Sequence, residues 1–202
     1  IQDMGANTIR VYTMLNDDFY NAFYEYNKNN ENPLYLIQGL WVNDYVQYSR
    51  LDAYSEQFRG QFLKDSKKIV DIIHGKRQIT IGGEAGTGFY FKDISPWVIG
   101  YILGVEWEDY TVAYTNDVQK QHTSYQGKYM KTTKEASAFE VMLAEVGDKI
   151  IDYESSRYKT QRLVAFSNWP TTDPFDYQKS VSEYFKKIAK VDVEHIETTD
   201  EF

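Results

Sequence analysis

Polar and aromatic residues stand at the ends of the apolar runs in this sequence, where their types could support chemistry. These residues are Arg10, Tyr12, Trp41, Glu106, Asn168 and Trp169. A carboxylate acts as an acid near neutral pH when aromatic, partly dry surroundings raise its pKa. Tyrosine and tryptophan offer a flat apolar face with a polar edge, which suits a sugar ring and equally an ordinary core. By their types alone, these residues could serve acid–base chemistry or sugar binding.

Each of these residues also has a structural interpretation. Glu106 could be a solvated residue that caps a loop at the end of a strand. Arg10 could serve an ion pair inside a barrel. Trp41 and Trp169 could pack at the rim of that barrel. The sequence leaves these alternatives open.

Alternating strands and helices are predicted to position these side chains. Strands are predicted at 7–13, 34–42, 79–81, 97–106, 162–168 and 191–195. Helices are predicted at 17–26, 55–74, 137–153 and 177–188, and an irregular segment is predicted at 107–133. The strands follow alternating or continuous apolar runs, and the helices follow apolar residues at helical spacing. This alternation favours parallel strands joined by right-handed crossovers.

The fold class that we predict is α/β, with an incomplete TIM-type (β/α) barrel of parallel strands in a single domain over residues 1–202. An open doubly wound sheet is the alternative, but the glycine-rich turn that usually follows its first strand is missing. Active sites of parallel barrels lie at the carboxyl ends of the strands. Alternation along the strands directs Arg10 and Tyr12 toward the barrel axis. It also places Gly100 and Gly104 on the face of Glu106, where two glycines would leave space.

The composition argues against several classes of function. The net charge is −8 and the pI is about 4.9, so the chain has no basic footprint for nucleic acid. The chain has no cysteine, which excludes disulfides and thiolate chemistry. The histidines lack zinc-motif spacing, and the glycine-rich segment 82–88 lacks the lysine of a phosphate loop. We expect no metal, no cofactor, no nucleic-acid partner and no membrane-spanning segment.

Two segments resemble a family of enzymes. Gly5-Ala-Asn-Thr-Ile-Arg-Val-Tyr12 is similar to the "G-x-N-x-I-R" strand of retaining glycoside hydrolases of the large (β/α)8-barrel clan, which includes β-galactosidases, β-mannosidases and β-1,3-glucanosyltransferases. Val98-Ile-Gly-Tyr-Ile-Leu-Gly-Val-Glu106 resembles that clan's fourth strand, which usually ends in Gly-Asn-Glu with Glu as the acid/base. The segments 139–144 and 165–174 are similar to barrel domains of bacterial surface proteins. The resemblance covers most of the chain through short motifs.

The resemblance implies a role for individual residues. Glu106 is the implied acid/base, and Arg10 is implied to support the carboxylates. The implied sugar-binding residues are Tyr12, Trp41, Trp107, Asn168 and Trp169. One departure is Val105, which stands where the clan usually has an asparagine that contacts the sugar 2-hydroxyl.

The second departure concerns the nucleophile. A retaining mechanism needs two carboxylates about 5–5.5 Å apart. The clan's nucleophile is a glutamate at the end of the seventh strand, whereas this chain reaches about the sixth. We therefore predict that these 202 residues, if the later strands are missing from them, bind glycans without turning them over.

The predicted function is hydrolysis or transglycosylation of β-linked glycans by a retaining mechanism. The alternatives are a non-catalytic carbohydrate-binding or scaffold domain on the same barrel, and an unrelated barrel enzyme acting on small metabolites. The expected location is outside the cell or on its surface, with any membrane anchor in other parts of a longer parent chain. Because an incomplete barrel exposes unpaired strand edges, self-association through these edges is also expected.

Overall fold

A computed structural model of the chain describes residues 1–42, 51–79, 86–104 and 106–202. Outside the described residues lie Ile81, residues 82–85 of the glycine-rich segment, and Val105. The helices are α1 (Asp17–Asn27), α3 (Gln61–Ile73), α4 (Asp109–Val118), α5 (Ala138–Tyr158) and α6 (Lys179–Tyr184). The strands are β1 (Thr8–Val11), β2 (Tyr35–Leu40), β3 (Arg77–Ile79), β4 (Gly88–Tyr90), β5 (Val98–Leu103), β6 (Met130–Thr132), β7 (Leu163–Phe166) and β8 (Ile196–Thr198).

Contacts between residues divide the chain into two compact units, and each unit draws on several parts of the sequence. Unit 1 holds Ile1–Trp41, Asp65–Leu103 and Arg162–Ala165. Unit 2 holds Val42–Lys64, Gly104–Gln161 and Phe166–Phe202.

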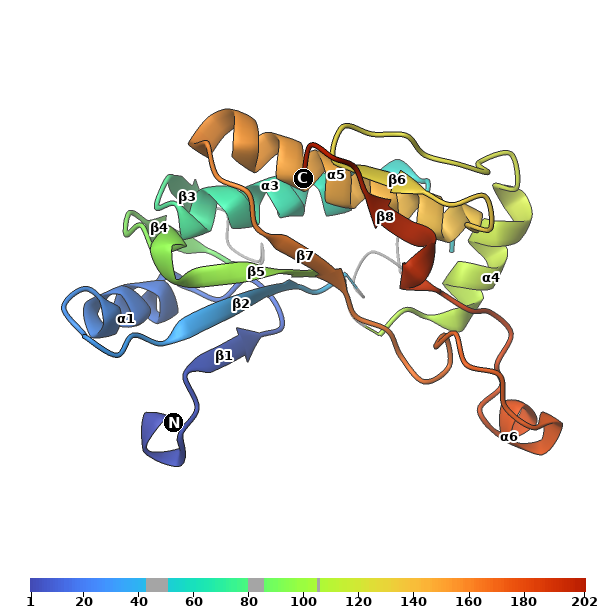
Figure 1. Ribbon diagram of the computed structural model, residues 1–202, viewed down its shortest axis with the longest axis horizontal. Helices are drawn as coiled ribbons and strands as arrows, with labels where there is room; N and C mark the ends of the chain where they lie inside the picture. Colours follow the sequence, from blue (N-terminus) through green and yellow to red (C-terminus); the bar gives the residue numbers. More distant parts are fainter. Residues whose placement is uncertain (43–50, 80–85, 105) are drawn as a thin grey trace. The chain divides into compact units, whose positions relative to one another are not determined.

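Unit 1 is built on a four-stranded sheet whose strands lie side by side in chain order, β1-β2-β5-β7 (Figure 1). β1 runs parallel to β2, with Arg10 opposite Ile37, and β2 runs parallel to β5, with Gly39 opposite Ile102. This arrangement confirms the predicted α/β class with a parallel sheet. The sheet is open, with β1 and β7 at its edges, so the described residues show a partial α/β fold and no closed barrel. Ile79, the one described residue of the strand predicted at 79–81, ends β3, which pairs antiparallel with β4 outside the parallel sheet.

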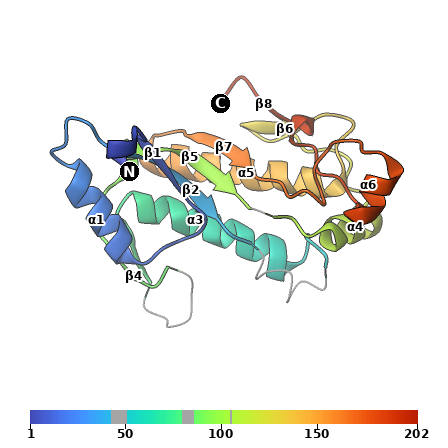
Figure 2. The ribbon, with the colours of Figure 1, turned by 90° about the horizontal axis from the view of Figure 1, so that it is seen from below.

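One face of this sheet packs against helices, as the alternation along β5 predicts. Tyr101 and Leu103 are both buried. Gln38 on β2 is fully buried as well, and its side-chain oxygen accepts a hydrogen bond of 2.9 Å from the Tyr20 hydroxyl on α1. Figure 2 shows α1 and α3 on the same side of the sheet, which is where right-handed crossovers between successive neighbouring strands place them.

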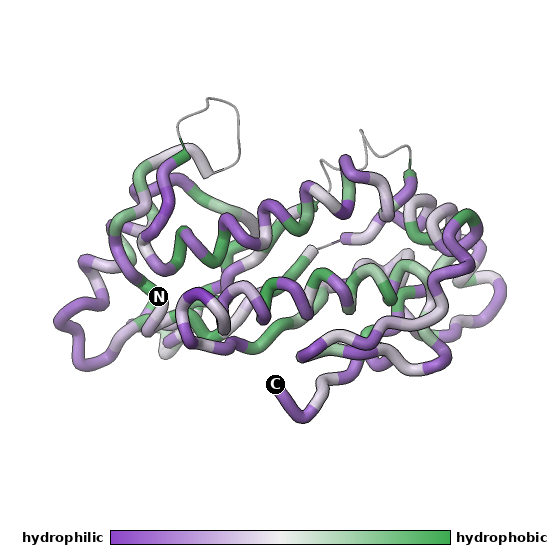
Figure 3. The backbone as a smooth tube through the Cα atoms, turned by 90° about the horizontal axis from the view of Figure 1, so that it is seen from above, coloured by the Kyte–Doolittle hydropathy of each residue, from purple (hydrophilic) through white to green (hydrophobic). Residues whose placement is uncertain are grey.

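Unit 2 is organised around the long helix α5. A capping box begins this helix: the Ser137 hydroxyl accepts from the Glu140 amide, and the Glu140 carboxylate accepts from the Ser137 amide at 2.8 Å. Every residue of Ala138–Asp148 except Glu145 is buried. Figure 3 shows hydrophobic and hydrophilic residues alternating along the helices, as is typical of helices with a buried side.

The segment 107–133 was predicted to be irregular, and that prediction was wrong. It contains the helix α4 and the strand β6. The buried residues of α4 are Thr111, Val112 and Thr115, all of which are β-branched and favour strands when taken in isolation. Tertiary contacts hold this helix, because the Thr115 hydroxyl accepts a hydrogen bond of 2.9 Å from the amide of Ala53.

The C-terminal elements also differ from the prediction. The strand predicted at 191–195 is a 3-10 turn at Val193–His195 followed by β8. β8 pairs antiparallel with β6 and so forms no part of the parallel sheet. The helix predicted at 177–188 is shorter, because α6 ends at Tyr184.

Glu140 ties the C-terminal segment to α5. Its Oε1 accepts a hydrogen bond of 2.7 Å from the amide of Asp192, and its Oε2 lies 2.8 Å from Nδ1 of His195. Burial lowers the pKa of His195, but the hydrogen bond and the negative charge of Glu140 outweigh burial, so the pKa is raised above its usual 6.5. Protonated His195 therefore stabilises unit 2. This contribution is complete below about pH 6.5 and is lost as the pH rises through the raised pKa of the folded state.

We expect His195→Gln to remove a pH-dependent part of the stability. Between about pH 6 and pH 8, the free energy of unfolding of the wild type should fall by a few tenths to about 1 kcal/mol relative to the variant, because His195 is partly exposed. Urea unfolding of both proteins at each pH measures the difference. A wild-type advantage that stays constant, or that grows toward pH 8, contradicts this role for the pair.

Candidate functional site

Three of the predicted site residues lie together in unit 1. Tyr12 directly follows β1 and Trp41 directly follows β2, so the parallel pairing of these strands brings both residues to the same edge of the sheet. The ring centroids of Tyr12 and Trp41 are 6.3 Å apart in an edge-to-face arrangement. The guanidinium carbon of Arg10 lies 4.5 Å from the centroid of the Tyr12 ring, within the range of a cation–π contact. Tyr12 is 54% exposed, so this aromatic cluster is open to solvent.

Glu106 lines a hollow in unit 2. The other lining residues are Trp107, Glu108, Asp109, Trp169 and Thr171, and the cavity volume is about 260 Å³. The structure therefore brings together three residues that the sequence predicts for the site, namely Glu106, Trp107 and Trp169. Trp169 is 45% exposed, so its ring meets solvent beside the carboxylate.

The backbone at Glu106 adopts an unusual conformation. Its φ is 54°, in the left-handed region that residues with a side chain rarely occupy. Such conformations store about 1–3 kcal/mol of strain and are concentrated at functional sites. The same conformation also occurs at Leu51, Lys159 and Lys186, so by itself it assigns no role to Glu106.

Trp107 is placed differently from the prediction. It is only 2% exposed, and its ring packs against Phe62 and Phe139 with centroid distances of 6.3 and 5.2 Å. The space expected at Gly104 beside Glu106 is occupied by this ring, because a Cβ on Gly104 would lie 1.8 Å from Cη2 of Trp107. Trp107 is therefore mainly a core residue of unit 2 that also forms part of the wall of the hollow.

We expect Gly104→Ala to destabilise the protein by about 2–4 kcal/mol, because the new methyl group meets the Trp107 ring and the residue has a φ of 70°. Gly5→Ala is a control for the backbone term alone, since Gly5 has a φ of 82° with nothing within 4 Å of its Cβ position. Urea unfolding followed by tryptophan fluorescence measures both variants. Equal destabilisation by the two substitutions would contradict the steric role of Trp107.

Asn168 holds the loop beneath Trp169. Its side-chain amide donates hydrogen bonds to the carbonyls of Thr172 and Val191 at 3.0 and 2.7 Å. Its side-chain oxygen accepts from the Thr172 hydroxyl at 2.6 Å and from the Trp169 amide at 3.0 Å. These contacts use the donors and acceptors of Asn168, so its geometry is that of a residue that positions Trp169.

The hollow includes acidic residues for which the sequence offers no motif. Glu108 and Asp109 line it together with Glu106. Glu108 is the N-cap residue of α4 without a side-chain capping bond, and Asp109 accepts a hydrogen bond of 2.9 Å from the amide of Tyr110. Their position follows from α4, a helix that the sequence pattern does not predict. Within the described ranges, no three or more His, Asp and Glu side chains are grouped to hold a metal ion.

The described part of the chain contains no helix that is both long and apolar enough to cross a membrane. Comparisons with protein-family models, with curated protein sequences and with solved structures find no match to this chain. The membership of the glycoside hydrolase clan thus stays a prediction from the short motifs in the sequence.

Proposed function

We propose that this chain is the sugar-handling part of a retaining enzyme that hydrolyses or transfers β-linked glycans, with Glu106 as the acid/base. The observation that carries the proposal is the hollow in unit 2. There, Glu106 and the exposed Trp169 come from separate segments of the sequence and line one open cavity. A carboxylate beside an exposed aromatic ring is the combination that sugar chemistry needs, because the ring can hold the sugar while the acid protonates the leaving oxygen.

In the proposal, Arg10, Tyr12 and Trp41 form a sugar-binding surface of unit 1, and no residue is assigned as nucleophile. Parallel strands in chain order are compatible with a section of a (β/α) barrel, which we include in the proposal.

The second candidate is a carbohydrate-binding domain without catalysis. It is favoured by two predicted sugar-binding residues whose side chains have structural roles. The Trp107 ring packs in the core, and the Asn168 side chain bonds to its own loop. The partner is a β-glycan in both cases. A polymer of this kind fits a location outside the cell or on its surface, and β1 and β7 as sheet edges fit self-association.

A panel of substrates tests the proposal. Reducing-sugar release and chain-length redistribution would be measured on β-1,3-, β-1,4- and mixed-linkage glucans and on β-mannan, with an α-glucan as control. Binding to the same glycans would be measured in parallel by affinity electrophoresis. The 202 residues alone are expected to bind without turnover in both cases, so turnover is measured on a longer natural chain that contains them. Turnover of a β-glycan by that chain supports the enzyme, and binding without turnover by that chain supports the carbohydrate-binding domain. The absence of both, or equal binding of the α-glucan, contradicts the proposed function.

A further inference from the structure

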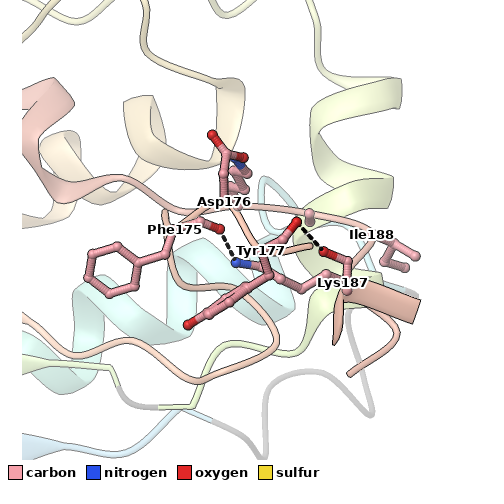
Figure 4. A pocket seen from close by; sticks show the side chains of 8 residues that line it. Phe175, Asp176, Tyr177, Lys187 and Ile188 are labelled. Atoms are coloured by element: carbon pink, nitrogen blue, oxygen red, sulfur yellow. Dashed lines mark hydrogen bonds and ion pairs between the residues drawn. The ribbon is translucent and has the colours of Figure 1, made fainter. Parts of the chain in front are cut away.

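Unit 2 contains a second hollow that shares no lining residue with the one beside Glu106. Its volume of about 330 Å³ lies within the range of about 300–1,000 Å³ that is typical of small-molecule sites. The lining residues used below are Phe175, Tyr177, Ser182, Lys187, Ile188 and Lys190 (Figure 4). Ser182 lies on α6, and the other five lie in the segments directly before and after this helix.

A buried lysine fixes the shape of this segment. The Lys187 side chain is 6% exposed and forms an ion pair with Asp173. Its ammonium group also donates to the carbonyls of Asp173 and Phe175 at 2.7 and 2.8 Å. These bonds satisfy the donors of Lys187 and hold two turns of the loop together. The hollow is therefore preorganised, which favours binding because less of the loop must be ordered by a ligand.

The same network orients the aromatic ring of Tyr177. Its hydroxyl donates to Oδ2 of Asp173 at 2.9 Å, and the Lys187 ammonium lies 4.7 Å from the centre of the ring. Tyr177 nevertheless remains 41% exposed. The ring is held at its hydroxyl and near the Lys187 ammonium and is still partly exposed, so it is a rigid platform for a flat ligand.

Apolar side chains extend this platform. Phe175 is 65% exposed and Ile188 is 52% exposed. Figure 4 shows the rings of Phe175 and Tyr177 projecting from the loop toward the same side. Large apolar side chains that gather on a surface usually mark a binding site, whereas single ones need no explanation.

The charges around the hollow are balanced. Lys190 forms an ion pair with Asp176, and Lys187 forms one with Asp173. No excess of either sign is left among these pairs to select a charged ligand. Exposed aromatic faces with a neutral polar rim, to which the Ser182 hydroxyl contributes, suit a neutral sugar: its C–H face can stack and its hydroxyl groups can bond.

We propose that the hollow formed by Phe175, Tyr177 and Ile188 is a second carbohydrate subsite, which binds a neutral pyranose unit of the same β-glycan. This inference rests on the proposed function and adds a site to it. The two hollows are linked by one short segment, because Trp169 and Thr171 line the first and Phe175 begins the second. A glycan held by the second hollow is thereby kept near the loop that carries Trp169.

Oligosaccharide binding to matched variants tests the subsite. Isothermal titration calorimetry would measure binding of β-1,3- and β-1,4-linked gluco-oligosaccharides and manno-oligosaccharides to the complete chain. Phe175→Ala and Tyr177→Ala are each expected to raise the Kd about tenfold by removing a stacking ring. Tyr184→Ala is the control, since Tyr184 is 81% exposed on α6 but does not line the hollow. Phe175→Ala keeps the backbone bonds of the loop, so it decides the question if Tyr177→Ala disturbs folding, as judged by circular dichroism.

The outcomes separate this subsite from the proposed function. Weaker binding by both ring variants, with Tyr184→Ala unchanged, supports the subsite. Wild-type affinity in Phe175→Ala, together with weaker binding in Trp169→Ala, overturns the subsite and leaves the proposed function standing. An equal loss in Tyr184→Ala also overturns the subsite. A wild-type chain that binds none of these β-glycans overturns both.

Discussion

Replacing Glu106 by glutamine is expected to lower the rate of β-glycan turnover by about 10²–10⁴-fold, the usual contribution of a positioned general acid or base. Glutamine keeps the size and the hydrogen-bonding capacity of the side chain but has no acidic proton to deliver to the glycosidic oxygen. Binding of the glycan should change little, so the loss should fall on kcat and not on KM. The measurement is reducing-sugar release by a natural chain that contains these residues and is active.

Glu108→Gln is the matched control for Glu106→Gln. Both residues line the same hollow, and both substitutions make the same chemical change two positions apart. We expect Glu108→Gln to retain most of the activity. A larger loss in Glu108→Gln would move the acid to Glu108 and contradict the assignment of Glu106. In a carbohydrate-binding domain without catalysis, neither variant has an activity to lose, and both bind the glycan with similar affinity.

The sequence predicts the strands that position Tyr12 and Trp41 in unit 1, because these strands follow local patterns. Alternating and continuous apolar runs identify β1, β2 and β5, and their order along the chain predicts parallel pairing. Parallel pairing alone then brings Tyr12 and Trp41 to one edge. No tertiary detail beyond the sheet is needed for this inference.

The part of the site in unit 2 depends on features that a pattern does not contain. Gly104 has no side chain, which leaves room for the Trp107 ring, and this tryptophan is buried in the core. Nothing in the residue types distinguishes that outcome from an exposed ring. The helix α4 was missed because its three buried residues, two threonines and a valine, are all β-branched. Glu108 and Asp109 at its start were therefore not grouped with Glu106.

The apolar residues of the helix predicted at 177–188 show a second kind of error, because their spacing predicts burial but two of them are exposed. Val181, Phe185 and Ile188 have helical spacing, which predicts a helix with an apolar stripe against a core. The helix ends before Phe185, and Phe185 and Ile188 are 40% and 52% exposed. Spacing identifies which residues share a side of a helix, but it does not say whether anything covers that side. Only the packed structure separates a core stripe from a binding surface.

Asp148→Ala is expected to destabilise the protein by about 3–5 kcal/mol, a large part of the stability of a typical domain. Asp148 lies on α5 and is 2% exposed. Its Oδ1 accepts hydrogen bonds from the amides of Tyr129 and Met130 at 2.6 and 3.0 Å, and its Oδ2 accepts one from the Tyr125 hydroxyl at 3.0 Å. Alanine would leave two buried backbone donors without a partner and create a void. Both contributions act in the same direction.

The substitution should act through β6, because Tyr129 and Met130 are the residues that bring this strand to α5. Asp148→Asn should cost less than alanine, since its amide oxygen can still accept from both backbone donors. Asp152→Ala is the control one turn further along α5, at a partly exposed position, and should change stability by less than about 0.5 kcal/mol. Urea unfolding measured by circular dichroism gives the three values. The expected order of the losses, from largest to smallest, is Asp148→Ala, Asp148→Asn and Asp152→Ala. A different order would show that the carboxylate of Asp148 does not join β6 to α5.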